Sequence, residues 1–117
     1  MPERIFDIKD RTLAFSLSII RFVSKLTQGT ANQIIIKQLI RCATSIGANI
    51  AEGYAGASKK DFTNYYNVAL KSANETVYWL TLLKETNESH SSEIDELIVE
   101  TNEIVRVLAK IVINCRR

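Results

Sequence analysis

The chain contains no proline after Pro2, so the residue that breaks both helices and sheets is missing from nearly its whole length. Glycine or polar clusters interrupt the apolar pattern at only three places, around Gly29, at 53–58 and at 87–92. Between these breaks apolar residues recur every third or fourth position, which is the period of an amphipathic helix. The sequence therefore predicts one all-α domain over residues 1–117, with helices at about 8–28, 32–52, 59–86 and 93–115.

Residues at the expected helix ends fit this division. Gly29 is predicted to close the first helix as a left-handed C-terminal cap, and Gly53 is predicted to end the second. Ser58 and Asp61 have the spacing of a capping box at the start of the third. Because short links force neighbouring helices to be antiparallel, we expect an up-down-up-down four-helix bundle.

The third predicted helix carries a second line of residues, well away from its expected core stripe. Apolar residues aligned over about four turns indicate a contact surface rather than scattered exposed hydrophobic side chains. The first predicted helix is likewise apolar over more than half of its circumference. We therefore predict self-association, with a candidate oligomer interface formed by Val68, Ser72, Glu75, Trp79 and Leu82.

Composition excludes several classes of protein. No apolar run approaches the roughly 18 residues that would span a bilayer, and residues 1–4 lack the apolar core of a secretory signal. Two cysteines cannot form a disulfide framework. These features predict a cytoplasmic protein without a membrane partner.

Catalytic chemistry has few candidate residues. His90 is the only histidine and falls in a polar link, which excludes a histidine-based metal site or triad within one chain. Cys42 and Cys115 lie among apolar residues and are predicted to pack rather than react. The glycines near 53–56 lack the Gly-Lys-Ser/Thr run of a phosphate loop. We expect a protein that is not an enzyme and that holds no metal and no cofactor.

Charge is small in total but segregated along the chain. The net charge is +2, with an excess of five positive charges in residues 1–84, seven acidic and no basic residues in 85–105, and four basic and no acidic residues in 106–117. This pattern permits nucleic-acid binding without requiring it. Tyr65, Tyr66, Tyr78 and Trp79 are candidates to stack on bases, although core or interface packing is the favoured interpretation. The candidate nucleic-acid contacts are Arg11, Arg21, Lys25, Lys59, Lys60, Arg116 and Arg117.

Residues 38–54 (QLIRCATSIGANIAEGY), 58–62 (SKKDF) and 69–76 (ALKSANET) form the most distinctive pattern. They closely resemble the four helix bundle protein family, also called the 23S rRNA-intervening-sequence protein family, with Cys42 replacing the usual small residue. The resemblance implies a ring-shaped homo-oligomer, typically a pentamer, in a family whose genes occur inside intervening sequences of bacterial large-subunit ribosomal RNA genes. Related proteins serve diversity-generating retroelements as accessory subunits that bind nucleic acid and a reverse transcriptase.

The resemblance and the charge pattern lead to one hypothesis, a non-catalytic homo-oligomer that binds nucleic acid, in particular structured RNA. The alternative is a protein-binding scaffold or accessory subunit with no nucleic-acid role.

The motif residues also have a structural interpretation. They form one polar face of the second helix, and if that face meets the third helix, Arg41 is placed to pair with Glu75, with Asn49 and Ser72 satisfied nearby. Buried polar contacts of this kind specify geometry more than they add stability. We favour this interpretation over a ligand site. The family-motif polar face is Arg41, Ser45, Asn49 and Glu52.

Overall fold

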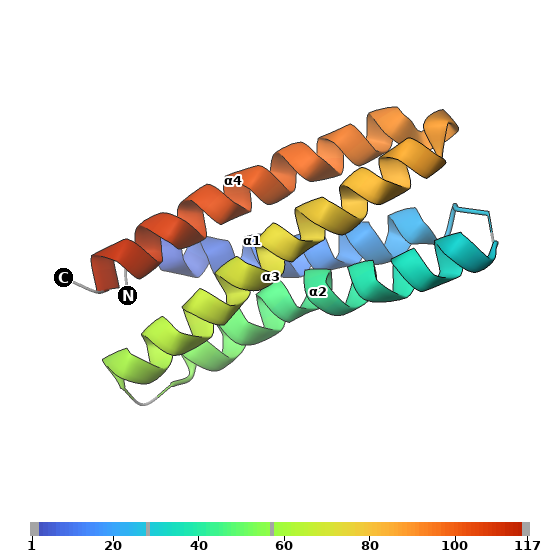
Figure 1. Ribbon diagram of the computed structural model, residues 1–117. Helices are drawn as coiled ribbons and strands as arrows, with labels where there is room; N and C mark the ends of the chain where they lie inside the picture. Colours follow the sequence, from blue (N-terminus) through green and yellow to red (C-terminus); the bar gives the residue numbers. More distant parts are fainter. Residues whose placement is uncertain (1–2, 28, 57, 116–117) are drawn as a thin grey trace.

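The structure is a computed structural model that describes residues 3–27, 29–56 and 58–115, with side chains from Ile8 onward. These residues form an all-α fold of four helices without strands (Figure 1). The elements are α1 (Glu3–Val23), α2 (Thr30–Tyr54), α3 (Lys59–Thr86), the short 3-10 helix η1 (Glu88–His90) and α4 (Ser91–Cys115). Within the described ranges, no helix is long and apolar enough to cross a membrane.

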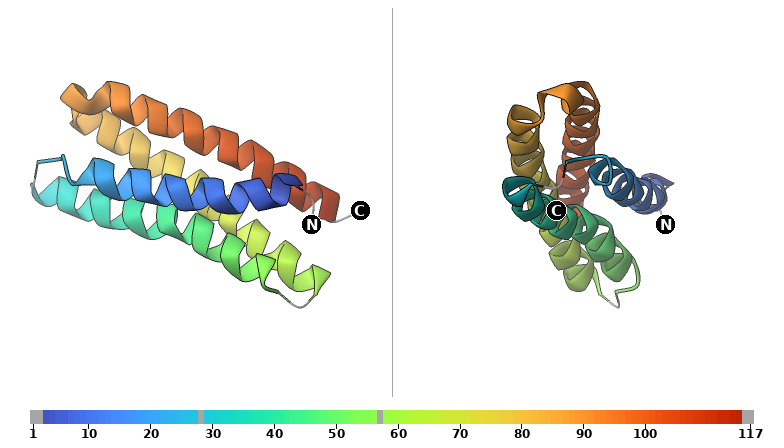
Figure 2. Two further views of the ribbon diagram at one scale, coloured as in Figure 1. Left: turned by 180° about the vertical axis from the view of Figure 1, so that it is seen from behind. Right: turned by 90° about the vertical axis from the view of Figure 1, so that its right-hand side faces the viewer.

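The molecule is elongated, with principal extents of 44 × 21 × 19 Å. The chain reverses direction at each link, and the start of α1 and the end of α4 lie at the same end of the molecule (Figure 1). α2 packs extensively on α3, and α3 packs on α4, whereas α1 contacts α2 more than it contacts α4. Figure 2 shows α1 beside α2, with its other flank open. The α1–α4 contact is therefore the weakest side of the bundle.

One buried stripe on each helix builds the core. The stripes follow from the helical period, which brings residues three and four positions apart to the same face. Ile19, Leu39, Ile46, Leu80 and Leu108 have no exposed surface. The partly buried side chains packed around this core include Ile36, Ile40, Phe62, Leu70, Trp79, Ile98 and Val105.

The link between α1 and α2 differs from the prediction. α1 ends at Val23 rather than near residue 28, and the chain continues in tight turns that bury Leu26. Gly29 has φ −97° and ψ 162° and is the N-cap of α2, and no glycine among the described residues has a positive φ. The prediction of a left-handed cap at Gly29 is wrong, because the turns after Val23 already end α1 before the glycine is reached.

The link between α2 and α3 keeps only part of the expected capping. α2 continues through Gly53 to Tyr54, so Gly53 does not end the helix. Gly53 is buried against the Tyr66 ring, which stacks on Phe62 with ring centroids 4.1 Å apart. Ser58 caps α3 as predicted, since its side chain accepts a 3.1 Å hydrogen bond from the Asp61 backbone N–H.

Candidate nucleic-acid interface

Carboxylates of α4 bind two of the three predicted contacts near the start of the chain, Arg11 of α1 and Lys25 of the turn that follows it. The Arg11 guanidinium donates from Nε to Oε2 of Glu100 at 2.7 Å and from Nη2 to Oε1 at 2.6 Å. The same Nη2 lies 2.5 Å from Oε2 of Glu103. A bidentate ion pair between a guanidinium and a carboxylate is stronger than one with a single hydrogen bond. Arg11 is therefore occupied within the subunit.

Lys25 is engaged in the same way, while Arg21 is not. Lys25 Nζ lies 2.9 Å from Oε2 of Glu93, and this hydrogen bond holds the pKa of the Glu93 carboxyl below its usual value. Arg21 is exposed and has no ion pair with any residue that the structure describes. Of Arg11, Arg21 and Lys25, which were predicted to lie on one helix, only Arg21 is left open to a phosphate, and Lys25 lies in the turn after α1.

A groove of about 450 Å³ separates α1 from α4 along this contact. Its walls carry the ion pairs, and Phe15, Phe22 and Leu97 contribute apolar surface. Because cations and carboxylates alternate along it, the groove offers no sustained positive field to a polyanion.

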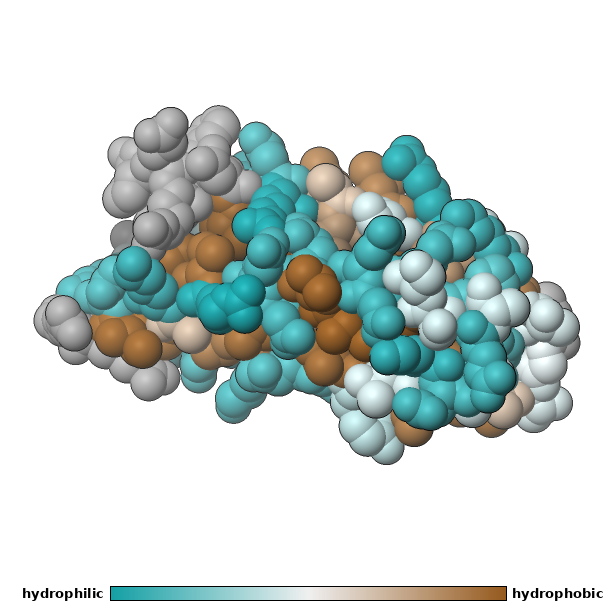
Figure 3. All heavy atoms as spheres, turned by 90° about the horizontal axis from the view of Figure 1, so that it is seen from above, coloured by the Kyte–Doolittle hydropathy of each residue, from teal (hydrophilic) through white to brown (hydrophobic). Residues whose placement is uncertain are grey.

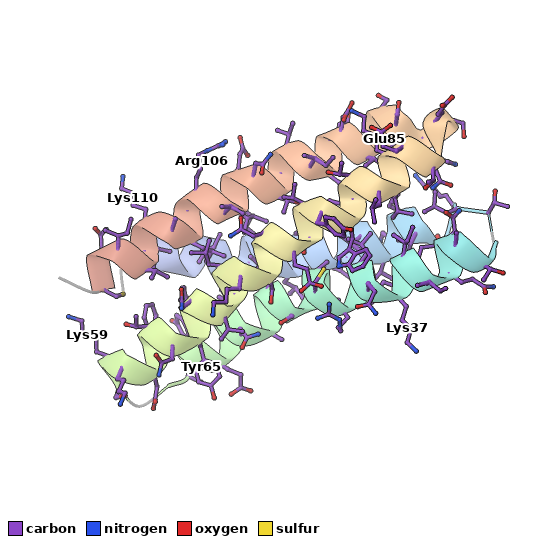
Figure 4. All side chains as sticks on the ribbon, in the orientation of Figure 1. Lys37, Lys59, Tyr65, Glu85, Arg106 and Lys110 are labelled. Atoms are coloured by element: carbon purple, nitrogen blue, oxygen red, sulfur yellow. The ribbon has the colours of Figure 1, made fainter. Side chains whose placement is uncertain are left out.

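Two further predicted cations, Lys59 and Lys60, begin α3. Lys59 and Lys60 are exposed at the start of α3, and Lys59 points away from the helix bundle (Figure 4). Arg116 and Arg117 lie outside the described residues. The block at 106–117, which has no acidic residue, also contains two cations that were not among the predicted contacts. Arg106 and Lys110 lie on the exposed face of α4 and point away from the bundle (Figure 4).

The motif face of α2 meets α3 within one subunit. Arg41 forms an ion pair with Glu75, which confirms the predicted pairing. Trp79 Nε1 donates a 2.8 Å hydrogen bond to the same carboxylate. The Trp79 bond, together with the Arg41 charge, lowers the pKa of Glu75.

A second polar contact lies one turn along the same helices. Ser72 Oγ donates to Ser45 Oγ at 3.0 Å, and Asn49 Nδ2 donates to the Ser45 carbonyl at 2.8 Å. Glu52, the last motif residue, is exposed. The motif therefore serves mainly to join α2 to α3.

This geometry changes the interpretation of the candidate oligomer interface on α3. Ser72 and Glu75 contact α2, Trp79 packs against the core, and Leu82 is half-buried. Val68, which is 45 % exposed, is the member of the stripe that lies most open. α1 exposes more large apolar side chains than this candidate interface does.

On α1, Leu13, Leu17 and Ile20 are 63 %, 42 % and 46 % exposed. Beside Leu13 lies a hollow of about 380 Å³, also lined by the small residues Gly47, Ala48 and Ala51 of α2. By contrast, hydrophilic side chains cover most of the face over α4 and separate its hydrophobic areas (Figure 3). Self-association through α1 is thus better supported by exposure than association through the candidate oligomer interface on α3.

The residues considered for catalysis lie apart from one another. His90 belongs to η1, where its ring meets Phe22 edge-on with centroids 5.9 Å apart. Cys42 is fully buried, and burial raises the pKa of its thiol, which keeps it protonated. The described residues contain no group of three or more His, Cys, Asp or Glu side chains that could hold a metal ion.

Comparison with known proteins adds a family and a fold. Residues 4–110 match the family model described as "23S rRNA-intervening sequence protein". The chain is also similar to a crystal structure from Bacteroides thetaiotaomicron, described as a protein with unknown function from the S23 ribosomal protein family. The two share 36 % identity, the match covers 93 % of this chain and 97 % of that chain, and the TM-score is 0.85. No curated protein matches the chain.

Proposed function

Because the chain belongs to the 23S rRNA-intervening sequence protein family, we propose that it is a non-catalytic homo-oligomer that binds nucleic acid, in particular structured RNA, through charge. The observation that carries this proposal is the division of its cations into two sets. Arg11, Arg41 and Lys25 are bound to carboxylates. A second set is exposed and has no ion pair to any described residue, and such cations are available to phosphates. This set includes Arg21, Lys60, Lys71, Arg106 and Lys110.

The proposed assembly is a ring of up-down-up-down bundles, with five copies as the expected number. The exposed line of Leu13, Leu17 and Ile20 supports assembly, because aligned apolar side chains of this size usually mark contact surfaces. Assembly also matters for binding. One subunit offers few free cations, whereas several subunits bound to one strand gain affinity through multivalency.

Sequence specificity is expected to be weak. Phosphate contacts position a protein on nucleic acid but carry no base information. The free cations lie on helical surfaces of a bundle, with no recognisable base-reading module. We place this activity in the cytoplasm.

The alternative is a protein-binding scaffold, favoured by the apolar hollow between α1 and α2. The two functions make different predictions about salt. For a nucleic-acid binder, log affinity falls linearly with log salt, with a slope near −0.7 per contacted phosphate on single strands. A scaffold that binds through apolar surface shows little such dependence.

Filter-binding titrations with structured RNA at several salt concentrations, combined with light scattering, test the proposal. We expect a stable oligomer at micromolar concentration and an affinity that falls steeply with salt. A monomer would refute the assembly. An oligomer without detectable RNA binding at low salt would refute the nucleic-acid role and favour the scaffold.

A further inference from the structure

The solvent side of α3 carries a stripe without a single carboxylate. Its members recur at helical spacing over 19 residues, which corresponds to about 27 Å between the first and the last. No acidic residue occurs between Asp61 and Glu75, and Glu75 is paired with Arg41. The α3 stripe consists of Lys60, Asn64, Asn67, Lys71, Asn74 and Tyr78.

The polar groups of the α3 stripe are not used inside the subunit. Lys60 and Lys71 are exposed and make no ion pair with the residues that the structure describes. The three asparagine amides likewise make no side-chain hydrogen bond within the described ranges, and only Asn67 is half-buried. Free amides beside free ammonium groups provide donors for both phosphate and sugar or base oxygens.

Tyr78 adds an exposed aromatic face to the α3 stripe. It is 57 % exposed, and its ring packs edge-on against Trp79, with centroids 5.0 Å apart and an interplanar angle of 78°. Trp79 is itself fixed by its hydrogen bond to Glu75. The Tyr78 ring is therefore held in place while it remains open to solvent, which is the arrangement needed for a base to stack on it.

α4 carries further positive charge, on the edge of the helix that lies away from α3 (Figure 4). Its C-terminal half, from Ile104 to Cys115, contains Arg106 and Lys110 and no carboxylate. Both side chains are exposed and point away from the bundle, and neither is paired within the described residues (Figure 4). Glu85 lies toward the opposite end of the molecule (Figure 4), so the charges are separated along the bundle axis.

We propose that a single-stranded segment of RNA lies along the α3 stripe, with its phosphates on Lys60 and Lys71 and with a base stacked on Tyr78. This inference rests on the proposed nucleic-acid function and moves its contact surface from α1 to α3. A single strand fits better than a duplex, because only unpaired bases can stack on a side chain.

Two double charge reversals test the surface. Lys60→Glu/Lys71→Glu places two carboxylates on the α3 stripe, and Lys9→Glu/Lys37→Glu makes the same change in net charge on α1 and α2. With a fluorescently labelled single-stranded RNA of mixed sequence, the first variant should lose at least about tenfold in affinity, and its salt slope should become shallower by about 1.4 units. The second should bind within about threefold of the parent. Circular dichroism and light scattering confirm that both variants keep the parent's fold and assembly.

Tyr78→Ala and Tyr78→Phe test the stacking contact. Tyr78→Ala should lower affinity for the single strand about tenfold and leave affinity for a duplex of the same sequence unchanged, whereas Tyr78→Phe should retain the parent's binding of both. A comparable loss on the duplex would overturn the stacking role. Unchanged affinity of Tyr78→Ala for the single strand would overturn it as well.

The results separate this inference from the function on which it rests. If the parent binds RNA and Lys60→Glu/Lys71→Glu binds equally well, the surface is wrong and the function stands. If the parent shows no binding at low salt, both are wrong.

Discussion

The indole Nε1 of Trp79 donates a 2.8 Å hydrogen bond to the carboxylate of Glu75, one turn earlier on α3, and this carboxylate also binds Arg41 of α2. A single anion thus orients an aromatic side chain and joins two helices. These contacts also explain why most of the predicted oligomer interface on α3, which looks solvent-facing in sequence, is half-buried.

Glu75→Gln should make the protein less stable at neutral pH, and the difference should disappear in acid. The native pKa of Glu75 is lowered by the Trp79 hydrogen bond and by Arg41. A lowered native pKa stabilises the fold above the ordinary glutamate value of about 4.3, and this contribution is lost as pH falls through the native value. Urea unfolding should show a deficit of up to about 1 kcal/mol at pH 7, since the pair is partly exposed. A deficit that stays constant down to low pH would contradict this account.

Two glycine substitutions in α2 should have opposite effects. A Cβ at Gly53 would lie 2.9 Å from two carbons of the buried Tyr66 ring. Gly53→Ala should therefore destabilise the fold by about 1–3 kcal/mol, the usual cost of overpacking. At Gly47 the nearest atoms, those of Thr12, are 3.5 Å away, which is ordinary contact. Gly47→Ala should stabilise the helix by about 0.5–1 kcal/mol. Thermal unfolding of both variants measures the signs, and equal signs would show that the Tyr66 contact is relaxed at little cost.

Leu13→Asp/Leu17→Asp should dissociate the oligomer without unfolding the subunit. Both side chains are exposed on α1, so a charge there meets only water in the free subunit but is buried in a contact between copies. Light scattering should show a smaller species with unchanged helical circular dichroism. Val99→Asp is the matched control, because Val99 is 59 % exposed on α4 and should tolerate the charge. If only Val99→Asp dissociates the oligomer, the contact lies on α4.

Trp79→Asp should behave differently from the α1 variants. Trp79 packs against the core and is tied to Glu75, so the new carboxylate would lie beside an existing one. We expect loss of helical signal or a clearly lowered melting temperature rather than clean dissociation. A folded, dissociated Trp79→Asp subunit would restore the predicted oligomer interface on α3, formed by Val68, Ser72, Glu75, Trp79 and Leu82.

Arg11→Ala should weaken the attachment of α1 by about 1 kcal/mol, as expected for a partly exposed ion-pair network. The effect should shrink as salt is added, since mobile ions screen exposed pairs. Arg21→Ala provides the comparison, because Arg21 has no ion pair to a described residue. Urea titrations at low and high salt measure both variants, and a salt-independent loss would assign the role of Arg11 to packing instead.

Local sequence patterns predicted much of the fold. The lack of proline and the helical period predicted four helices, and Ser58 predicted the start of α3 because a cap depends only on neighbouring residues. The Arg41–Glu75 pair was predictable because the family motif supplies the matching faces of α2 and α3.

Other features depend on which helices become neighbours. Periodicity shows the face on which Arg11 lies, but not that Glu100, 89 positions away, packs against it. The same limit applies to Leu13 and Leu17, whose exposure follows from α1 turning Phe15 and Ile19 inward instead. Arg106 and Lys110 carried a signal in the acid-free block at 106–117, but the charge pattern did not show that they share an end of the bundle with Lys59.

The uneven packing of α1 has a consequence for how the subunit opens. α2 packs extensively on α3, and α3 packs on α4. By contrast, α1 makes few contacts with α4, across a groove bridged by salt-sensitive ion pairs. Regions with fewer buried contacts open at lower free energy than the rest of a domain. Backbone amides of α1 should therefore exchange with deuterium sooner than those of α3, and added salt should widen the gap. A subunit whose α1 has detached in this way would expose Phe15 and Ile19 to solvent. Assembly through α1 would oppose this detachment by holding α1 against the rest of the bundle.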